Sequence, residues 1–270
     1  MIKVIDSHIH FWDISNGYND WVKGTDLPKL VTPENLDAQA YVHIEAHGDA
    51  FSPLCEYEWL KQDFPFKNIK VVAFADFTLE LKDFESSISK LAKYKDIVGV
   101  RQIMSSSDKS DYSPFDKAIP KDIQAKLEVL EQNNLVFEAQ MYPEQFLPIM
   151  DVINNSGVKM AVEHFGLPIF ASNGNIKEWQ KFIKDISQNK NWHLKLSGFD
   201  LNNEISNVDR ALDFVFDNIK EKQLCYGSNF PVSYTKNYSF WQNYLEEYIN
   251  NDSVSQSIFY DVAKNIYAID

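Results

Sequence analysis

The sequence predicts a (β/α)8 barrel, and three observations carry that prediction. Eight short apolar runs recur along the 270-residue chain. Helical patterns lie between them, and strands that alternate with helices form parallel βαβ units. Eight such units in about 250 residues are what a closed barrel requires. A doubly wound open sheet is the alternative, because periodicity alone does not show that a sheet closes.

The predicted strands are short apolar runs, and polar side chains stand at the C-terminal ends of six of them. In a barrel, that end carries the active site. The eight strands cover Lys3–His8, Ala40–Ala46, Lys70–Phe77, Ile97–Ile103, Leu135–Gln140, Lys159–His164, His193–Ser197 and Leu224–Gly227.

The predicted helices show apolar residues at helical spacing, most plainly at Phe84, Ile88 and Leu91. A last helix is expected to close the barrel, and two polar segments are expected to be surface loops. The helices cover Leu79–Tyr94, Lys121–Asn133, Pro143–Asn155, Ile176–Asn189, Asn207–Lys220, Phe240–Asn250 and Val254–Tyr267; the loops are Asp13–Leu36 and Ser105–Tyr112.

Composition indicates a single domain over residues 1–270 with ample apolar content for a core, at 44% hydrophobic and 14% aromatic residues. The formal charge of −13 argues against a nucleic-acid partner and an anionic membrane surface. No apolar run approaches the roughly 20 residues of a membrane helix. Cys55 and Cys225 show no disulfide or metal-ligand spacing, and no leader pattern precedes the first strand, so we expect a cytoplasmic protein. The sequence does not indicate an oligomeric state.

The most informative motif is the pair His8-x-His10 at the end of the first strand. Alternate side chains of a strand share one face, so both imidazoles project into the same space. Two convergent imidazoles can bind a divalent metal or polarise a substrate. An exposed, histidine-rich strand end is the alternative interpretation. No Gly-x-Gly-x-x-Gly turn follows this strand, which argues against a nucleotide cofactor.

The ordered set of strand-end motifs resembles the amidohydrolase superfamily, and most closely its branch of sugar and carboxylate lactonases. The resemblance extends from the first strand to beyond the eighth and implies a (β/α)8 barrel that hydrolyses a small lactone or a related ester or amide. The motifs are His8-x-His10-Phe11-Trp12, Gly99-Val100-Arg101, His164-x-Gly166-x-Pro168, Leu196-Ser197-Gly198 and Gly227-Ser228-Asn229-Phe230-Pro231-Val232.

The resemblance implies roles for the histidines and one arginine. His8, His10 and His164 match the histidines that line the family's site and bind a divalent metal in its metal-dependent members. Three neutral imidazoles with an open position suit zinc, which polarises a carbonyl. Arg101 matches the arginine thought to hold substrate oxygen, either by binding a carboxylate or by stabilising an oxyanion. A structural ion pair is the alternative role of Arg101.

Three departures from the family pattern lower the expected metal affinity. Asn229 stands where most active relatives carry the aspartate that activates water, and an amide is not a general base at neutral pH. It can still orient a water molecule or a carbonyl. Gln140 stands where many metal-binding members have a histidine, and Glu163 where lactonases often have aspartate. Zinc is therefore a possible but doubtful cofactor.

Other residues could complete the site. On the second strand, alternation places His43, Glu45 and His47 on one face, so Glu45 or His47 could supply the missing base; a buried polar network or an exposed loop start is the alternative. Trp12 could form the floor of a substrate pocket, or pack in the core. Lys195 is expected to pair with Glu138 or Glu163.

Three functions follow from these residues. The first is hydrolysis of a small lactone or related cyclic ester or amide, with His8 or His10, Glu45 or a substrate carboxylate aiding water attack and Arg101 and His164 polarising the carbonyl. The second is metal-dependent, non-oxidative decarboxylation, which other barrels of this superfamily perform. The third is a barrel that binds a small ligand without catalysis, which the loss of the carboxylate at Asn229 suggests.

Overall fold

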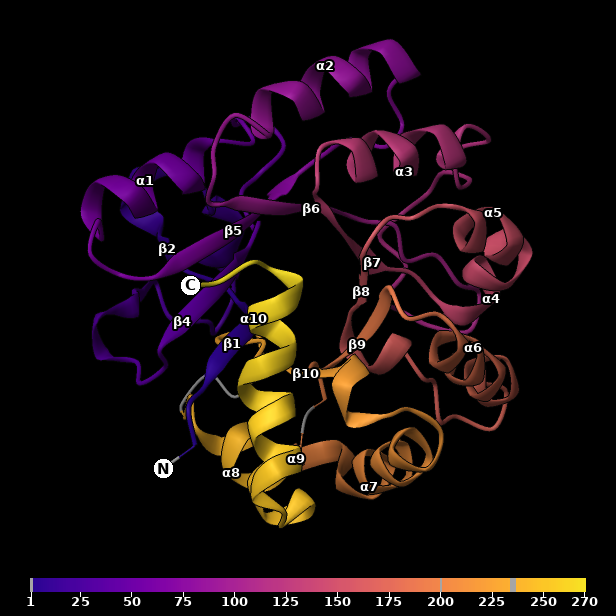
Figure 1. Cartoon of the computed structure of the whole chain (residues 1–270). Helices are drawn as coiled ribbons and strands as arrows, with labels where there is room; N and C mark the ends of the chain where they lie inside the picture. Colours follow the sequence, from indigo (N-terminus) through magenta and orange to yellow (C-terminus); the bar gives the residue numbers. More distant parts are fainter. Residues whose placement is uncertain (1, 200, 234–236) are drawn as a thin grey trace.

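The eight predicted strands form one parallel sheet that closes on itself (Figure 1). The computed structural model describes residues 2–199, 201–233 and 237–270, without the side chains of 202–204. The strands follow chain order around the sheet, from β1 to β10. Between these two strands, Ile9 bridges Phe230, and the backbone N–H of His10 donates to the carbonyl of Phe230 over 2.9 Å. The chain therefore folds as a (β/α)8 barrel.

The observed strands agree with the predicted ones to within a few residues. They are β1 Ile5–Ile9, β4 Ala40–Ile44, β5 Ile69–Phe74, β6 Ile97–Ile103, β7 Val136–Gln140, β8 Met160–Val162, β9 Trp192–Leu196 and β10 Leu224–Tyr226. The largest difference with consequence for the site is in β8, which ends before Glu163 and His164, so both residues belong to the turn that follows. The short strands β2 (Trp12–Asp13) and β3 (Leu30–Val31) pair antiparallel in the first loop.

The helices surround the barrel, and one of them was not predicted. α1 (Cys55–Asp63) lies between β4 and β5. The predicted helix Pro143–Asn155 is divided by a 3-10 turn that contains Pro148, since proline interrupts helical hydrogen bonding. The others are α2 Leu81–Leu91, α3 Ile123–Gln132, α4 Pro143–Phe146, α5 Met150–Asn155, α6 Ile176–Gln188, α7 Leu201–Asn218, α8 Phe240–Ile249, α9 Asp252–Gln256 and α10 Val262–Ile266.

Alternate side chains of the strands divide the core into an inner and an outer layer. Val42 and Val72 lie in an inner cluster inside the barrel, whereas Tyr41 and Val71 lie in an outer cluster between the barrel and the helices. The inner cluster includes Ile266 and Tyr267 from the C-terminal segment. The predicted closing helix therefore covers one end of the barrel.

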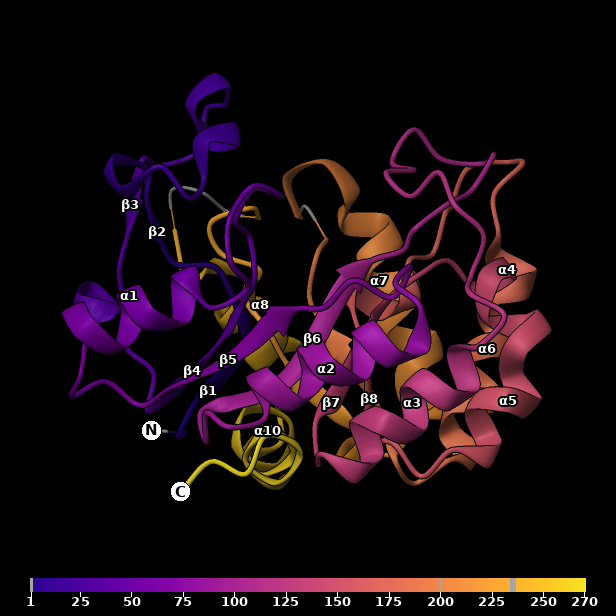
Figure 2. The same ribbon diagram turned by 90° about the horizontal axis from the view of Figure 1, so that it is seen from above.

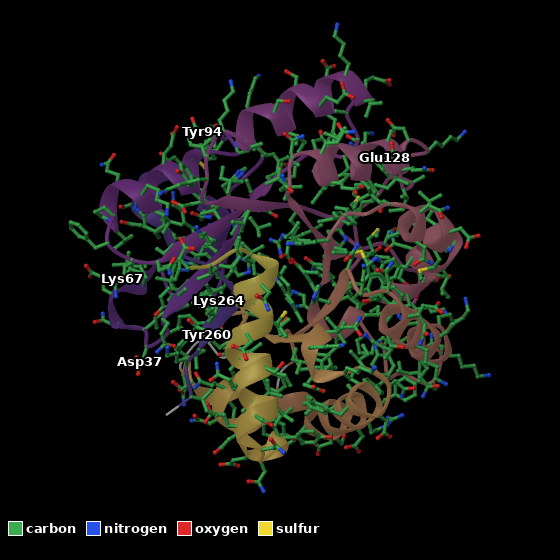
Figure 3. The ribbon with its side chains drawn as sticks, viewed as in Figure 1. Asp37, Lys67, Tyr94, Glu128, Tyr260 and Lys264 are labelled. Carbon is green, nitrogen blue, oxygen red and sulfur yellow. The ribbon has the colours of Figure 1, made fainter. Side chains whose placement is uncertain are left out.

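The two ends of the barrel differ in what covers them (Figure 2). The C-terminal helical segment that ends in α10, residues 252–266, lies across one end, and Tyr260 and Lys264 lie on its outer surface (Figure 3). The long loops, including the β2–β3 hairpin, project from the opposite end. This second end is formed by the C-terminal ends of the strands, which leaves it open for a site. Among the described residues, no helix has the length and apolar character needed to cross a membrane.

Candidate active site

A cavity of about 1120 Å³ opens at the C-terminal end of the barrel. Six of the eight predicted site residues line it, and each lies near or just beyond the C-terminal end of a different strand. The six are His10, Glu45, Arg101, Gln140, His164 and Asn229. His8 is fully buried behind them, in contact with the rings of His10 and His164. Trp12 does not line the cavity.

The first-strand histidines differ in how their nitrogens are used. His10 Nδ1 lies 2.9 Å from the carbonyl oxygen of Ile44, which can only accept, so Nδ1 carries the proton and Nε2 is left with its lone pair. Both nitrogens of His8 lack a hydrogen-bond partner among the described residues, although the side chain is fully buried. Unpartnered buried polar atoms are uncommon in proteins and indicate a binding function here.

His164 is held by an unusual backbone. Its φ angle is 52°, in the left-handed region, which costs a non-glycine residue of order 1–3 kcal/mol and is concentrated at functional sites. Gly198 makes room for the ring, because a Cβ there would lie 2.5 Å from His164 Cγ. Ser197 Oγ lies 2.9 Å from His164 Nδ1. The opposite nitrogen, Nε2, lies 3.7 Å from Glu163 Oε2, so the ring is oriented toward Glu163.

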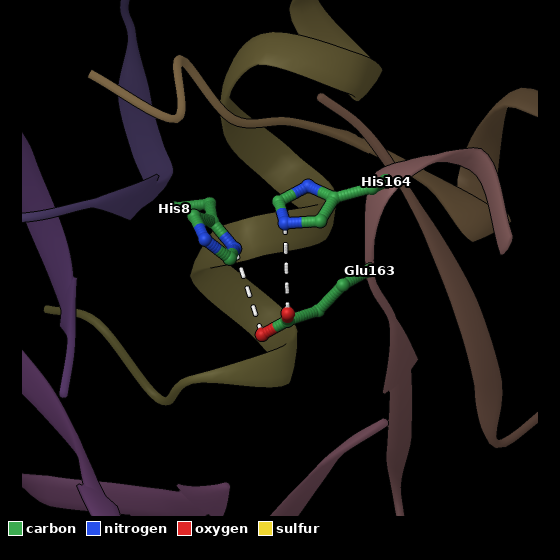
Figure 4. Close-up of side chains that lie close together, drawn as sticks. All are labelled: His8, Glu163 and His164. Carbon is green, nitrogen blue, oxygen red and sulfur yellow. Dashed lines mark ion pairs between the residues drawn. The ribbon is translucent and has the colours of Figure 1, made fainter. Parts of the chain in front are cut away.

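The Glu163 carboxylate faces both His8, which is fully buried, and His164, which is partly buried (Figure 4). Its Oε1 is 3.7 Å from His8 Nδ1, and its other oxygen faces His164. One donor atom from each of His8, Glu163 and His164 lies within 4.8 Å of the others. The sequence predicted His8, His10 and His164 as the metal-binding set. The structure instead brings Glu163 into the cluster, while His10 stands beside it.

Arg101 connects the cluster to the cavity wall. Its Nε donates to Glu45 Oε1 over 2.8 Å, and Nη2 donates to the Glu45 carbonyl over 2.6 Å. Nη1 donates to Glu163 Oε2 at 3.2 Å and to Gln140 Oε1 at 3.4 Å. A guanidinium has five N–H donors, so one N–H of Nη2 forms no hydrogen bond with any described residue. Arg101 is thus both an ion-pair partner and a cavity-lining donor.

Burial sets the protonation of the histidines and of Glu45. It lowers the pKa of His8 well below the ordinary value, and the Lys195 charge lowers it further. It also lowers the pKa of His10 well below the ordinary value, and there the Arg101 charge adds to the effect. It lowers the pKa of His164 to about 4, although the Glu163 carboxylate opposes this. Three imidazoles are therefore neutral at neutral pH. Burial raises the pKa of Glu45, partly offset by the Arg101 charge.

Asn229 lies on the far side of the cavity, next to the first strand. Its backbone N–H donates to the His8 carbonyl over 2.8 Å, and its Nδ2 donates to Ser233 Oγ over 3.1 Å. The amide oxygen is left as an acceptor. The φ angle of 51° is one that asparagine and aspartate tolerate. Gly227 allows this close approach, because a Cβ there would lie 2.6 Å from His8 Cβ.

Gln140, Glu45 and His47 line the cavity, whereas His43 faces away from it. Gln140 accepts from Arg101 and donates through Nε2 to the Tyr112 hydroxyl over 3.0 Å, so it links the arginine to a loop. Glu45 and His47 line the cavity. His43 does not share their face: it packs outward on Phe11 and lies 3.3 Å from Glu56 of α1. The strand ends at Ile44, and the alternation ends with it.

Trp12 contacts both His10 and Trp21, and Trp21 is a cavity residue that the sequence did not single out. The Trp12 indole lies 6.3 Å from the His10 ring, centroid to centroid, and its Nε1 donates to the Pro28 carbonyl. Trp21 contacts Trp12 edge-on, at 5.5 Å, and does line the cavity. Within the predicted loop Asp13–Leu36, no periodicity marked Trp21 as exposed to a pocket. Glu163 was named as a departure from the family pattern and as a possible partner of Lys195, but not as a member of the metal-binding set.

The donor set fits a divalent metal such as zinc. Neutral imidazole nitrogens and a carboxylate oxygen are zinc's usual protein ligands, and His8 has two unpartnered nitrogens. Glu163 also pairs with Arg101, which competes with a metal for the same carboxylate. The residues present therefore suit a metal, held by His8, Glu163 and His164.

The comparisons with known proteins agree with this fold. A family model described as Amidohydrolase matches residues 5–269, and the chain belongs to that family. An uncharacterized protein of Sinorhizobium fredii, y4mH, is 22% identical, with 99% of each chain covered. The structure of a zinc-bound amidohydrolase from Burkholderia multivorans has a TM-score of 0.78 at 17% identity, covering 99% of this chain and all of that one.

Structures of differently named proteins share the same fold. A probable 2-pyrone-4,6-dicarboxylic acid hydrolase from Acinetobacter baumannii, with citric acid bound, has a TM-score of 0.69 at 16% identity, covering 99% of this chain and all of that one. The 5-carboxyvanillate decarboxylase of Sphingomonas paucimobilis has a TM-score of 0.60 at 11% identity, with both chains fully covered. At these identities the likeness concerns the fold alone. The family supports an enzyme, and the reaction has to be argued from the residues.

Proposed function

We propose that the chain is a hydrolase that opens a lactone or a related cyclic ester or amide. The observation that carries this proposal is the pairing of Arg101 with Glu45 in the cavity wall. One partner offers an unused N–H to a substrate oxygen, and the other offers a carboxylate to a water molecule. Hydrolysis of a lactone needs a donor for the carbonyl oxygen and a base for the water that attacks the same carbonyl carbon.

Glu45 is suited to accept the proton of the attacking water. Only its Oε1 is held by Arg101, so Oε2 remains available. Burial raises its pKa, which moves a carboxylate toward the range in which a base works well near neutral pH. This assignment supplies the base that Asn229 cannot provide. The amide oxygen of Asn229 would orient the water.

Arg101 and the histidines would act on the carbonyl and the leaving oxygen. The free N–H of Arg101 Nη2 would stabilise the negative charge that develops on the carbonyl oxygen. Water adds to the carbonyl carbon, the ring C–O bond breaks, and the ring oxygen leaves as a hydroxyl group with a proton from that water. The product is a hydroxycarboxylate. A divalent metal held by His8, Glu163 and His164 would supply Lewis acidity toward the carbonyl.

The direct test is turnover of a lactone panel by the purified protein, after chelation and with added zinc or manganese. We expect ring opening above the uncatalysed rate, falling by about 10²–10⁴-fold in Glu45→Gln. Asp49→Asn is the matched control, since Asp49 lines the same cavity without an ion pair to Arg101 among the described residues. No turnover across the panel would refute the proposal. Carbon dioxide release from aromatic carboxylic acids would then favour the decarboxylase alternative.

Asn229→Asp separates a working enzyme from a degenerate one. Aspartate adopts the left-handed backbone as asparagine does, so the fold should be kept. With Glu45 as the base, we expect the substitution to change kcat by less than about tenfold, equivalent to about 1.4 kcal/mol. Steady-state kinetics and zinc content would be measured on both proteins. If the wild type is inert and Asn229→Asp is active, the natural chain is a ligand-binding barrel.

A further inference from the structure

The cavity is larger than the cluster at its floor requires. Its volume of about 1120 Å³ exceeds the roughly 300–1,000 Å³ of pockets that bind drug-sized molecules. The residues assigned to the reaction, Arg101, Glu45 and His164 among them, form only part of the lining of this cavity. A single lactone ring placed there would leave most of the space to water.

Trp21 forms a fixed aromatic wall in the remaining space. Its ring is 46% exposed and lines the cavity. Its Nε1 donates to the Ala46 carbonyl over 2.6 Å, and its edge contact with buried Trp12 fixes the other side. The indole is therefore held in place with an apolar face toward the cavity. Exposing a large apolar face next to a catalytic cluster is unfavourable unless a ligand covers it.

Two further aromatic residues face the same space from different loops. Phe51 is 37% exposed and packs edge-on against Tyr18. Tyr112 is 45% exposed, and its hydroxyl is held by Gln140 Nε2. Both line the cavity. Of the eight large apolar side chains that are exposed in the described part of the chain, these two, Trp21 and Val232 line this one cavity.

The charges around the cavity do not favour a carboxylate on the substrate. Arg101 spends four of its five donors on protein oxygens, so it cannot bind a carboxylate bidentately. Among the lining residues described, Lys117 is the only other lysine or arginine. Three further carboxylates line the same cavity, those of Asp49, Asp76 and Asp116. They would repel an anionic group.

We propose that the substrate is a lactone with an uncharged apolar arm, and that the arm lies against Trp21, Phe51 and Tyr112 while the ring is opened beside Arg101. This inference rests on the proposed hydrolase function and adds the substrate class to it. The aromatic wall binds the arm, and the polar floor acts on the ring.

The test compares six-membered lactones, three of which have the same saturated ring. The probes are δ-valerolactone, δ-decalactone with its five-carbon arm, glucono-δ-lactone, and 2-pyrone-4,6-dicarboxylate as the anionic member. We expect kcat/KM for δ-decalactone to exceed that for δ-valerolactone by about tenfold or more, because even one methylene in an apolar pocket contributes 10–200-fold. Trp21→Ala should lower kcat/KM for δ-decalactone by about tenfold and change kcat/KM for δ-valerolactone by no more than about twofold.

Phe66→Ala is the control, because Phe66 is fully exposed and does not line the cavity. It should change neither rate. Equal turnover of the armed and unarmed lactones, a preference for the sugar lactone or the dicarboxylate, or no selective effect of Trp21→Ala would overturn the inference and leave the hydrolase intact. Absence of turnover for every lactone would instead refute the proposed function, and the inference with it.

Discussion

Two clusters of buried charge in this barrel differ in what they leave unpaired. In the first, at the cavity, Arg101 pairs with Glu45 and Glu163, yet one arginine N–H and both nitrogens of His8 have no hydrogen-bond partner in the described part of the chain. In the second, Lys195 lies 2.7 Å from Glu138 Oε2 and donates to the Ser7 carbonyl over 2.7 Å. The hydroxyl of Tyr267, at the end of α10, donates to the other Glu138 oxygen.

The difference separates binding from stability. The second cluster is fully buried and pairs its charges with one another and with the C-terminal segment. The first has the same kind of buried ion pair, but its arginine lines the cavity with an unused donor and His8 lies directly behind the lining residues with unused nitrogens. Buried polar groups without a hydrogen-bond partner indicate a ligand, whereas buried polar groups that are paired within the protein indicate a structural role. Substitutions in the two clusters should therefore affect different measurements.

The largest effect is expected from Lys195→Met, measured as unfolding free energy in urea. Removing one partner leaves the Glu138 carboxylate buried without a counterion, which costs about 3–5 kcal/mol. The double variant Lys195→Met/Glu138→Gln should recover much of this loss, since it removes the unpaired charge and keeps an acceptor for the Tyr267 hydroxyl. A loss below about 1 kcal/mol in the single variant would show that the second cluster is not structural.

Arg101→Lys should give the next largest effect, and this effect should be on catalytic activity. Lysine keeps the charge but loses the planar fork that contacts Glu45, Glu163 and the substrate together. We expect kcat/KM to fall by about 10²–10³-fold, as for loss of an oxyanion donor. Lys117→Met, a cavity-lining control without an ion pair among the described residues, should stay within a few-fold. Retention of near-normal turnover in Arg101→Lys would remove the arginine from the proposed mechanism.

The sequence predicted the elements of the barrel well because each strand is a short apolar run between polar segments. Ile97–Ile103 was predicted to the residue. It also placed Arg101, Gln140 and Asn229 at one end, since parallel strands in a barrel bring their C-terminal ends together. Lys195, in the middle of a strand, was expected to pair with Glu138 or Glu163, and the pair with Glu138 is confirmed.

What the sequence did not predict depends on the path of the chain beyond the strand ends. Alternation ends with the strand, so His43 faces outward while Glu45 lines the cavity. Glu163 reaches His8 because β8 ends at Val162, two residues earlier than predicted, and the following backbone enters the left-handed region at His164. Trp21 lies in a long loop whose fold is set by tertiary contacts, so its place above Trp12 leaves no periodic signal.

The smallest predicted effect comes from His193, near the start of β9 and away from the cavity. Burial, with a smaller contribution from Lys159, lowers its pKa to about 4. The unfolded chain has the ordinary value of about 6.5, so it binds more protons between these two pH values. Stability is fully present above pH 6.5 and falls as the pH drops toward 4. At pH 5 the loss from this residue should be about 2 kcal/mol.

The measurement is the difference in urea unfolding free energy between pH 7 and pH 5, compared between the wild type and His193→Gln. Glutamine does not titrate, so the variant should lose less stability on acidification, while other acid-sensitive groups affect both proteins equally. Turnover at pH 7 should be unchanged, because His193 lies toward the end of the barrel opposite the cavity. An identical pH dependence in the two proteins would show that His193 is not held neutral. A change in turnover would place it closer to the first cluster than its strand position indicates.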